Sequence, residues 1–244
     1  MKKRLCLFVV LVVAAVAAQV ALYAHRPVRV PALAESAFAA FGGLRSIAAE
    51  VTWFRADRLQ EEGRYAELAQ LARALTLAEP HVPEVWSYAA WNLAYNISVM
   101  MATEEDRWRW VRAGLSLLRD QGLKYNPTSA ELHRELAWMF ELKIGANIDS
   151  AAPLYREKWK QIVTDVAQRN AWHELKMEED FMKKMEAAAR ITDRTDPQYS
   201  AIYWAARGLT FAKKKADRAF LLEIIRQARV IYEQSHSKDP AKNG

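Results

Sequence analysis

Histidines and carboxylates are the side chains with the greatest potential for chemistry, and their spacing here indicates neither a catalytic nor a metal site. The five histidines are spread over positions 25, 81, 133, 173 and 236. Glu174 follows His173, but the second histidine of a His-Glu-x-x-His zinc site is missing from the sequence. We therefore interpret each histidine as a surface or helix-end residue.

The carboxylates leave one enzymatic alternative. The acidic run 178–180 is typical of the first turn or the solvated face of a helix, where the helix dipole favours negative charge. A site built from Asp149, Asp165, His173 and Glu178 in the irregular region 145–195 has no supporting spacing, and nucleotide-binding and hydrolase motifs do not occur. We expect no catalytic residue, no metal and no cofactor, so the protein is predicted not to be an enzyme.

Composition favours helices and argues against nucleic acid as a partner. Glycine and proline occur only 8 times each, while tryptophan occurs 9 times. The net charge is +6, but Lys2, Lys3 and Arg4 carry three of these charges, which leaves a nearly balanced remainder. Cys6 is the single cysteine, so an intramolecular disulfide is impossible.

Glycine and proline residues, which favour turns and helix ends, divide the first part of the chain into helices. Apolar residues recur at helical spacing over 47–62 and 66–78, on either side of Gly63 and Tyr65. Pro80 should end the second of these helices. Pro83 suits the first turn of the next helix, which carries Trp86 and is predicted to run to about residue 101.

Further signals predict the remaining helices. Thr103 and Thr128 each begin a pattern typical of a capping box, so helices should start near residues 104 and 129. The segment 145–150 interrupts the pattern. Helices are then predicted over about 153–169 and 172–190, followed by one that Asp196 caps and that carries Trp204 and Gly208, and a last one that ends near residue 234.

This pattern resembles the tetratricopeptide repeat, a helix pair of 34 residues. Its spacings place Gly63 in the turn, Tyr65 directly after it, Pro80 at the end of the pair and Trp86 early in the next first helix. Ala89 and Ala90 then match the small residues where paired helices cross, and Trp204 and Gly208 match again. The resemblance implies an all-α, TPR-like α-solenoid of antiparallel helix pairs over 35–236, because stacked pairs share one core.

The resemblance is good over 47–142, partial over 197–235 and weak over 145–195. Pro80 and Pro127 are 47 positions apart, about 13 residues more than the family unit allows. We expect the extra residues to form a loop, to which Asn92 and Asn96 would hydrogen-bond.

In this family the first helices of the pairs line a concave groove that receives partners. Carried over residue by residue, the implied partner-binding positions are Trp53, Asp57, Ser87, Trp91, Tyr95, Arg134, Trp138 and Glu141. Tryptophan and arginine often dominate interface energies. The alternative for each tryptophan is a place in the core.

The chemistry of these positions indicates which partner to expect. Family grooves that hold a free C-terminal carboxylate use lysine and asparagine, whereas the corresponding residues here are Trp53, Asp57, Tyr88, Glu131 and Glu135. The resulting character is aromatic and acidic. A protein or peptide segment with basic or mixed aromatic and basic residues is the predicted partner.

The N-terminal segment 1–25 is predicted to be a signal anchor. Its basic head precedes 20 residues of which Gln19 is the clearly polar one, about the 30 Å that a membrane-spanning helix needs. The basic head favours a cytoplasmic N-terminus and an extracytoplasmic helical domain, in the periplasm of a bacterium. The alternative is a signal peptide that is cleaved after Ala18 or Ala24. Residues 26–34 read as a linker and 237–244 as a disordered tail.

These features favour a membrane-anchored scaffold or assembly protein that binds a protein partner through its concave surface. The alternative is an accessory subunit that is permanently packed into a membrane protein complex.

Overall fold

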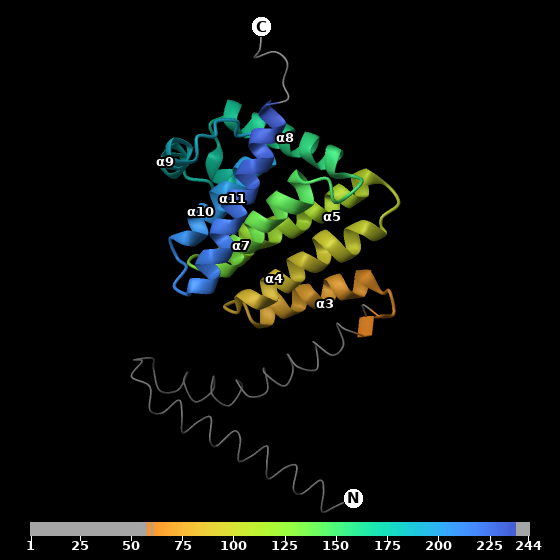
Figure 1. The fold of residues 1–244 in the computed structure, drawn as a ribbon. Coiled ribbons are helices and arrows are strands. Elements are labelled where there is room, and N and C mark those ends of the chain that lie inside the picture. Colours follow the sequence, from red (N-terminus) through yellow and green to blue (C-terminus); the bar gives the residue numbers. More distant parts are fainter. Residues whose placement is uncertain (1–57, 60, 238–244) are drawn as a thin grey trace, which may run out of the picture. The chain divides into compact units, whose positions relative to one another are not determined.

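The computed structural model describes residues 58, 59 and 61–237 (Figure 1). Contacts divide the chain into two compact units, 1–64 and 65–244. The predicted anchor and linker, together with Trp53 and Asp57, lie outside the described residues, as does the tail after Ser237.

The described part of the second unit is all-α, as predicted, with eight helices that pack sequentially when α5, η3 and α6 are counted as one helix. Three of them continue into π-helical or 3₁₀ segments, which carry η labels. No helix within 58–59 and 61–237 is both long and apolar enough to cross a membrane. The elements are α3 (Tyr65–Ala78), α4 (Pro83–Trp91), η1 (Asn92–Ile97), η2 (Ser98–Met100), α5 (Glu104–Ser116), η3 (Leu117–Gly122), α6 (Leu123–Tyr125), α7 (Ala130–Trp138), η4 (Met139–Gly145), α8 (Ala152–Gln168), η5 (Trp172–Leu175), α9 (Glu179–Ala189), α10 (Pro197–Leu209) and α11 (Lys215–Ser237).

The expected turn residues end and start helices where the sequence predicts. Gly63 has a φ of 68°, and the amide of Arg64 donates to the carbonyl of Leu59, which closes the preceding helix end. Pro83 occupies the first turn of α4. Trp86 is 1% exposed, and its indole N–H donates to the Pro80 carbonyl at 2.8 Å, so this side chain fixes the turn between α3 and α4.

The helix end predicted near 101 and the helix start predicted near 104 are confirmed, so the extra residues of 80–127 lengthen two helices and do not form the expected loop. α4 continues through η1 and η2 to Met100, and α5 continues through η3 and α6 to Tyr125, so the connection is only 101–103. Asn92 donates to the Tyr88 carbonyl and Asn96 donates to Asn92, both within their own helix.

Helix caps were predicted correctly in two places and missed by one residue in a third. The Thr103 hydroxyl accepts from the Asp106 amide, and the Asp196 carboxylate accepts from the Gln198 amide. α7, however, is capped by Ser129, whose hydroxyl accepts from the Leu132 amide. Thr128 therefore lies one position before the cap that we assigned to it.

The helix expected over 172–190 is broken in two. A short 3₁₀ turn, η5, ends at Leu175, the next residue Lys176 has a left-handed φ of 55°, and α9 begins only at Glu179. The amide of Glu178 is bound by the Tyr203 hydroxyl of α10 at 2.9 Å. A tertiary contact thus fixes a break that the apolar periodicity does not reveal.

The last two helices pack back on α7. α10 lies against α7 and η4, and α11 lies against α10, α7 and η4 (Figure 1). Trp204 is buried, and a Cβ on Gly208 would approach His133 Cβ to 3.0 Å and Leu221 Cδ2 to 3.1 Å. Gly208 therefore permits the close approach of three helices.

Candidate partner-binding surface

Three aromatic side chains form a continuous row across two neighbouring helices. Trp91, at the end of α4, stacks on Tyr95 in η1 with ring centroids 5.5 Å apart and an interplanar angle of 21°. Tyr95 in turn meets Trp138, the last residue of α7, at 6.3 Å. Trp91 is 37% exposed, and the other two are half-buried. We call these three residues the aromatic row.

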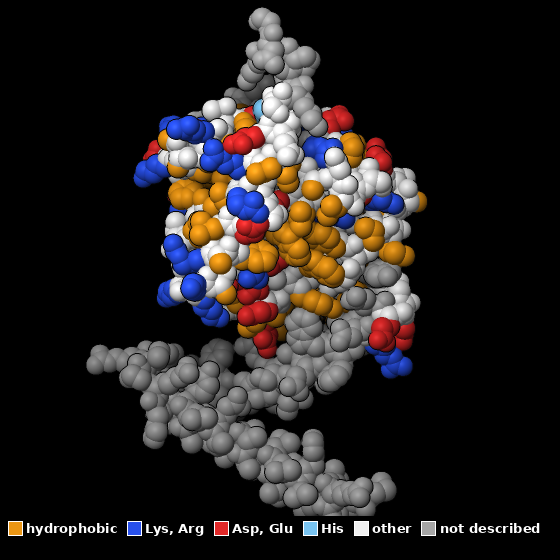
Figure 2. Space-filling view, viewed as in Figure 1, with side chains coloured by type: hydrophobic (Ala, Val, Ile, Leu, Met, Phe, Trp, Pro, Cys, Tyr) orange, Lys and Arg blue, Asp and Glu red, His pale blue; other side chains and the backbone are white. Residues whose placement is uncertain are grey.

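Most tryptophans outside the aromatic row lie in the core, which is the alternative that the sequence left open for each tryptophan. Buried tryptophans, each 7% exposed or less, are Trp86, Trp108, Trp159, Trp172 and Trp204. Trp91 and Trp138, two of the positions implied by the groove, remain accessible. Hydrophobic side chains gather on the face beside α11 in Figure 2.

Acidic residues border the aromatic row toward the beginning of α4 and α7. The Ser87 hydroxyl donates to the Glu131 carboxylate at 2.9 Å, which links the two helices. Burial raises the pKa of the Glu131 carboxyl. The hydrogen bond from Ser87 and the charge of Arg134 lower this pKa, and repulsion by Glu84 and Glu135 offsets part of that lowering. Burial also raises the pKa of the Tyr95 phenol, and Glu135 adds to the shift. This acidic edge therefore attracts positive charge.

Arg134 and Glu141, the other two described groove positions, face α10 and α11. The Arg134 guanidinium pairs with Glu135 at 3.0 Å, lies 3.6 Å from Asp217 and stacks over the ring of Phe220. Glu141 is 2% exposed. Glu141 is buried, unlike the aromatic row, because α11 packs on η4.

The Glu141 carboxyl occupies a costly environment. Its Oε1 atom has no hydrogen-bond partner among the described residues, and Gln198 Nε2 donates instead to the Glu141 carbonyl at 3.0 Å. Burial raises the pKa of this carboxyl to about 7, and repulsion by Glu223 adds to the shift. An unpaired buried carboxyl is protonated more readily because its charged form loses hydration.

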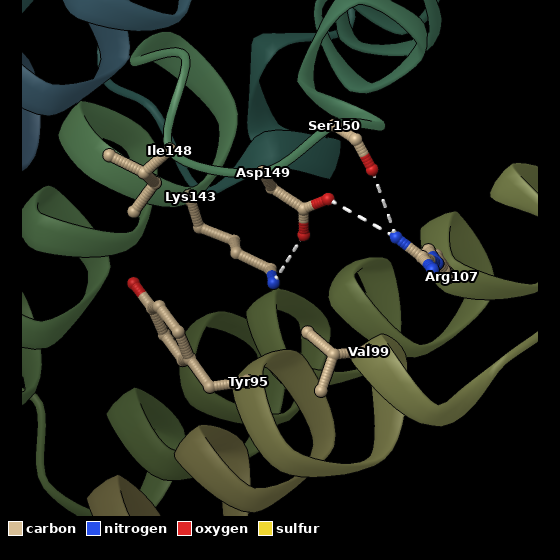
Figure 3. Close-up of a pocket in the computed structure, with 7 residues that line it drawn as sticks. All are labelled: Tyr95, Val99, Arg107, Lys143, Ile148, Asp149 and Ser150. Atoms are coloured by element: carbon tan, nitrogen blue, oxygen red, sulfur yellow. Dashed lines mark hydrogen bonds and ion pairs between the residues drawn. The ribbon is translucent and has the colours of Figure 1, made fainter.

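A buried ion pair next to the aromatic row was missed by sequence reasoning. The Lys143 side chain is 3% exposed, and its Nζ lies 2.6 Å from Asp149 Oδ2 and 5.1 Å from the centre of the Tyr95 ring (Figure 3). Tyr155 also donates to Asp149. Although burial opposes it, the hydrogen bond from Lys143 helps to hold the pKa of Asp149 below its usual value. The available signal was a lysine between apolar residues in 139–144.

The residues of the enzymatic alternative have separate partners. Asp149 pairs with Lys143, Asp165 pairs with Arg169, and Glu178 pairs with Arg207. His173 lies in the short turn η5. Within 58–59 and 61–237, no group of histidine, cysteine and acidic residues is arranged to hold a metal ion.

His133 is buried, so the interpretation of every histidine as a surface or helix-end residue is wrong for this one. It is 3% exposed, its ring lies 5.8 Å from that of Trp204 and 5.2 Å from that of Phe211, and Nδ1 lies 2.7 Å from the Ser129 carbonyl oxygen. Burial lowers the pKa of the imidazole to about 4.

Comparisons with known proteins add no further guide to this surface: no family model, no curated protein and no solved structure matches the chain.

Proposed function

We propose that this protein is a membrane-anchored, TPR-like scaffold or assembly protein that binds a protein segment through the aromatic row. The single observation that carries this proposal is the Trp91–Tyr95–Trp138 row, whose outer member is 37% exposed. Accessible tryptophan and tyrosine rings supply large apolar contact areas at a low cost in conformational entropy.

The TPR-like part of the proposal draws on the order and the crossings of the helices. α4, α7 and α10 follow one another in space, each next to the one before. A Cβ on Gly114 of α5 would lie 2.7 Å from the Ala90 carbonyl of α4, so a small residue is needed where these helices cross. These features are typical of stacked helix pairs. The long helices 83–100 and 104–125 depart from the family length.

The acidic edge supports a basic or mixed aromatic and basic segment as the partner. A lysine or arginine of the segment would gain from Glu84, Glu131 and Glu135 and from the face of an aromatic ring. The predicted signal anchor would hold the groove near membrane partners. Tethering raises the local concentration, so a modest intrinsic affinity would suffice.

Gentle capture of the full-length protein from its native membrane tests this proposal. We expect a co-purifying protein, identified by mass spectrometry, whose binding segment carries lysine or arginine beside an aromatic residue. The W91A/W138A variant should lose about 30-fold or more in affinity for that segment, because one central aromatic residue contributes ~2 kcal/mol or more and the contributions of two neighbours are not additive.

Val230→Ala is the control, since Val230 is an exposed apolar residue (42%) on α11 that belongs neither to the aromatic row nor to the acidic edge. It should leave binding unchanged. If W91A/W138A retains a native circular dichroism spectrum and still binds with the affinity of the unmodified protein, the groove proposal is wrong.

An accessory subunit, permanently packed into a membrane complex, is the alternative, and exposed apolar residues favour it. Val99, Met100 and Ile148 are 47%, 56% and 62% exposed, and Leu222 on α11 is 53% exposed. A variant without residues 1–25 should then self-associate when it is separated from its complex. A monodisperse, soluble monomer in size-exclusion chromatography would count against this alternative.

A further inference from the structure

The cavity beside the aromatic row has a mixed charged and apolar lining. Its volume is about 350 Å³, at the lower end of the range for ligand pockets. Side chains come from the end of the long helix 83–100, the start of α5, the end of η4 and the loop that follows (Figure 3). They are Tyr95, Val99, Arg107, Lys143, Ile148, Asp149 and Ser150.

Two cations and one carboxylate give the cavity a net positive charge. Asp149 accepts from Lys143, from the Tyr155 hydroxyl and from the Ala151 amide, and Arg107 Nη1 lies 3.6 Å from it. Three hydrogen bonds and the nearby guanidinium therefore use most of the acceptor capacity of this carboxylate. Asp149 holds both Arg107 and Lys143 at the cavity, but its single negative charge balances only one of the two positive charges.

Hydrogen-bond donors remain for a ligand. Arg107 Nε donates to the Met101 carbonyl at 3.1 Å and Nη1 to the Ser150 hydroxyl at 3.2 Å, while Nη2 has no hydrogen bond to the described residues. The ammonium of Lys143 has three N–H groups and one hydrogen bond, to Asp149. Burial of the Lys143–Asp149 ion pair costs hydration free energy, so a contribution to stability is a weak explanation for the presence of this pair.

The outer lining is apolar. Val99 and Ile148 are 47% and 62% exposed, and the Tyr95 ring lines the same cavity. A ligand that covered these side chains would gain from the removal of apolar surface from water. A small inorganic anion would leave this part of the cavity uncovered, and a cation would be repelled by Arg107 and Lys143.

We propose that this cavity binds an organic monocarboxylate with an adjacent apolar group. The carboxylate accepts hydrogen bonds from Arg107 and Lys143, and the apolar group covers Val99 and Ile148. This site adds a second ligand to the proposed function. It shares Tyr95 with the aromatic row, but Arg107 and Lys143, which would hold the carboxylate, lie outside the row.

N-acetyl-leucine and its uncharged analogue N-acetyl-leucinamide are the probes, because they differ only in the carboxylate. Binding to the full-length protein in lipid nanodiscs is measured by saturation-transfer NMR with competitive titration. We expect saturable binding of the acid and at least about tenfold weaker binding of the amide, as is typical for the loss of a hydrogen bond to a charged group. Equal binding of acid and amide would overturn the proposal.

Arg107→Gln should weaken the binding of N-acetyl-leucine by about tenfold or more. Arg109→Gln is the matched control: Arg109 lies on the same helix, is 78% exposed in its side chain and pairs with Asp106 outside the cavity. R109Q should bind the acid like the unmodified protein. An R107Q variant with unchanged affinity and a native fold would contradict the proposal even if the acid binds.

A tetrapeptide that ends in leucine, with a blocked N-terminus, distinguishes two sources of the same chemical group. Tighter binding of the peptide than of N-acetyl-leucine supports a carboxylate at the end of a protein chain. Binding of N-acetyl-leucine alone supports a free small acid. If neither probe binds the unmodified protein, the proposal is wrong.

Discussion

One helix, α7 with its continuation η4, has two sides with opposite properties. On the side of α4 and η1, Trp138 belongs to an aromatic row whose outer residue is 37% exposed. On the side of α10 and α11, His133 and Glu141 are 3% and 2% exposed. One side of this helix thus keeps an accessible aromatic surface, whereas the chain covers the other side with its own last helices.

The difference follows from what packs against each side. α11 contacts α7 and η4, so it covers this side of the helix. Asp217 and Phe220 of α11 engage Arg134. A repeat pattern therefore predicts where groove positions lie on each helix, but it does not predict which of them another part of the chain covers.

The strongest test of the covered side is Leu221→Ala against its neighbour Leu222→Ala. Leu221 is fully buried where α11 meets Gly208, whereas Leu222 is 53% exposed. We expect L221A to lower the free energy of unfolding by about 2–5 kcal/mol, because it removes buried methyl groups and leaves a cavity. L222A should change it by less than about 0.5 kcal/mol.

Urea denaturation of the full-length protein in detergent, followed by circular dichroism, measures both variants. Equal losses in L221A and L222A would mean that α11 does not cover α7 in the way described. Binding at the aromatic row should survive L222A, which keeps the two sides of α7 separable.

Much of the fold can be predicted from the sequence because its signals are local. Pro83 suits a first helical turn, Thr103 and Asp196 cap helices, and Gly63 adopts a positive φ, which each residue type favours by itself. Trp91 and Tyr95 share a face because they are four residues apart on a helix.

The features that could not be predicted depend on distant parts of the chain. The break at Lys176 accompanies a hydrogen bond that the Glu178 amide donates to the hydroxyl of Tyr203, 25 positions away. The pairing of Lys143 with Asp149 depends on the turn after η4, and the burial of Glu141 depends on α11. Periodicity reports which face of a helix is apolar and not which other element will cover its polar residues.

Two buried titratable residues on the covered side, Glu141 and His133, provide a finer test with smaller effects. The Glu141 pKa rises from its usual 4.5 to about 7, so its contribution to stability is present at low pH and is lost as the pH rises from 4.5 to 7. The His133 pKa falls from its usual 6.5 to about 4, so its contribution is present at high pH and is lost as the pH falls from 6.5 to 4.

Between pH 4.5 and 6.5 these two dependences oppose each other, and single substitutions separate them. Relative to the unmodified protein, Glu141→Gln should gain stability as the pH rises, with a slope of up to about 1.4 kcal/mol per pH unit. His133→Gln should gain stability as the pH falls, with the opposite slope. Urea denaturation at several pH values gives both slopes, and the difference from the unmodified protein cancels the contributions of other groups. A slope near zero for E141Q would mean that the Glu141 carboxyl is hydrated, in which case α11 does not cover this side of η4.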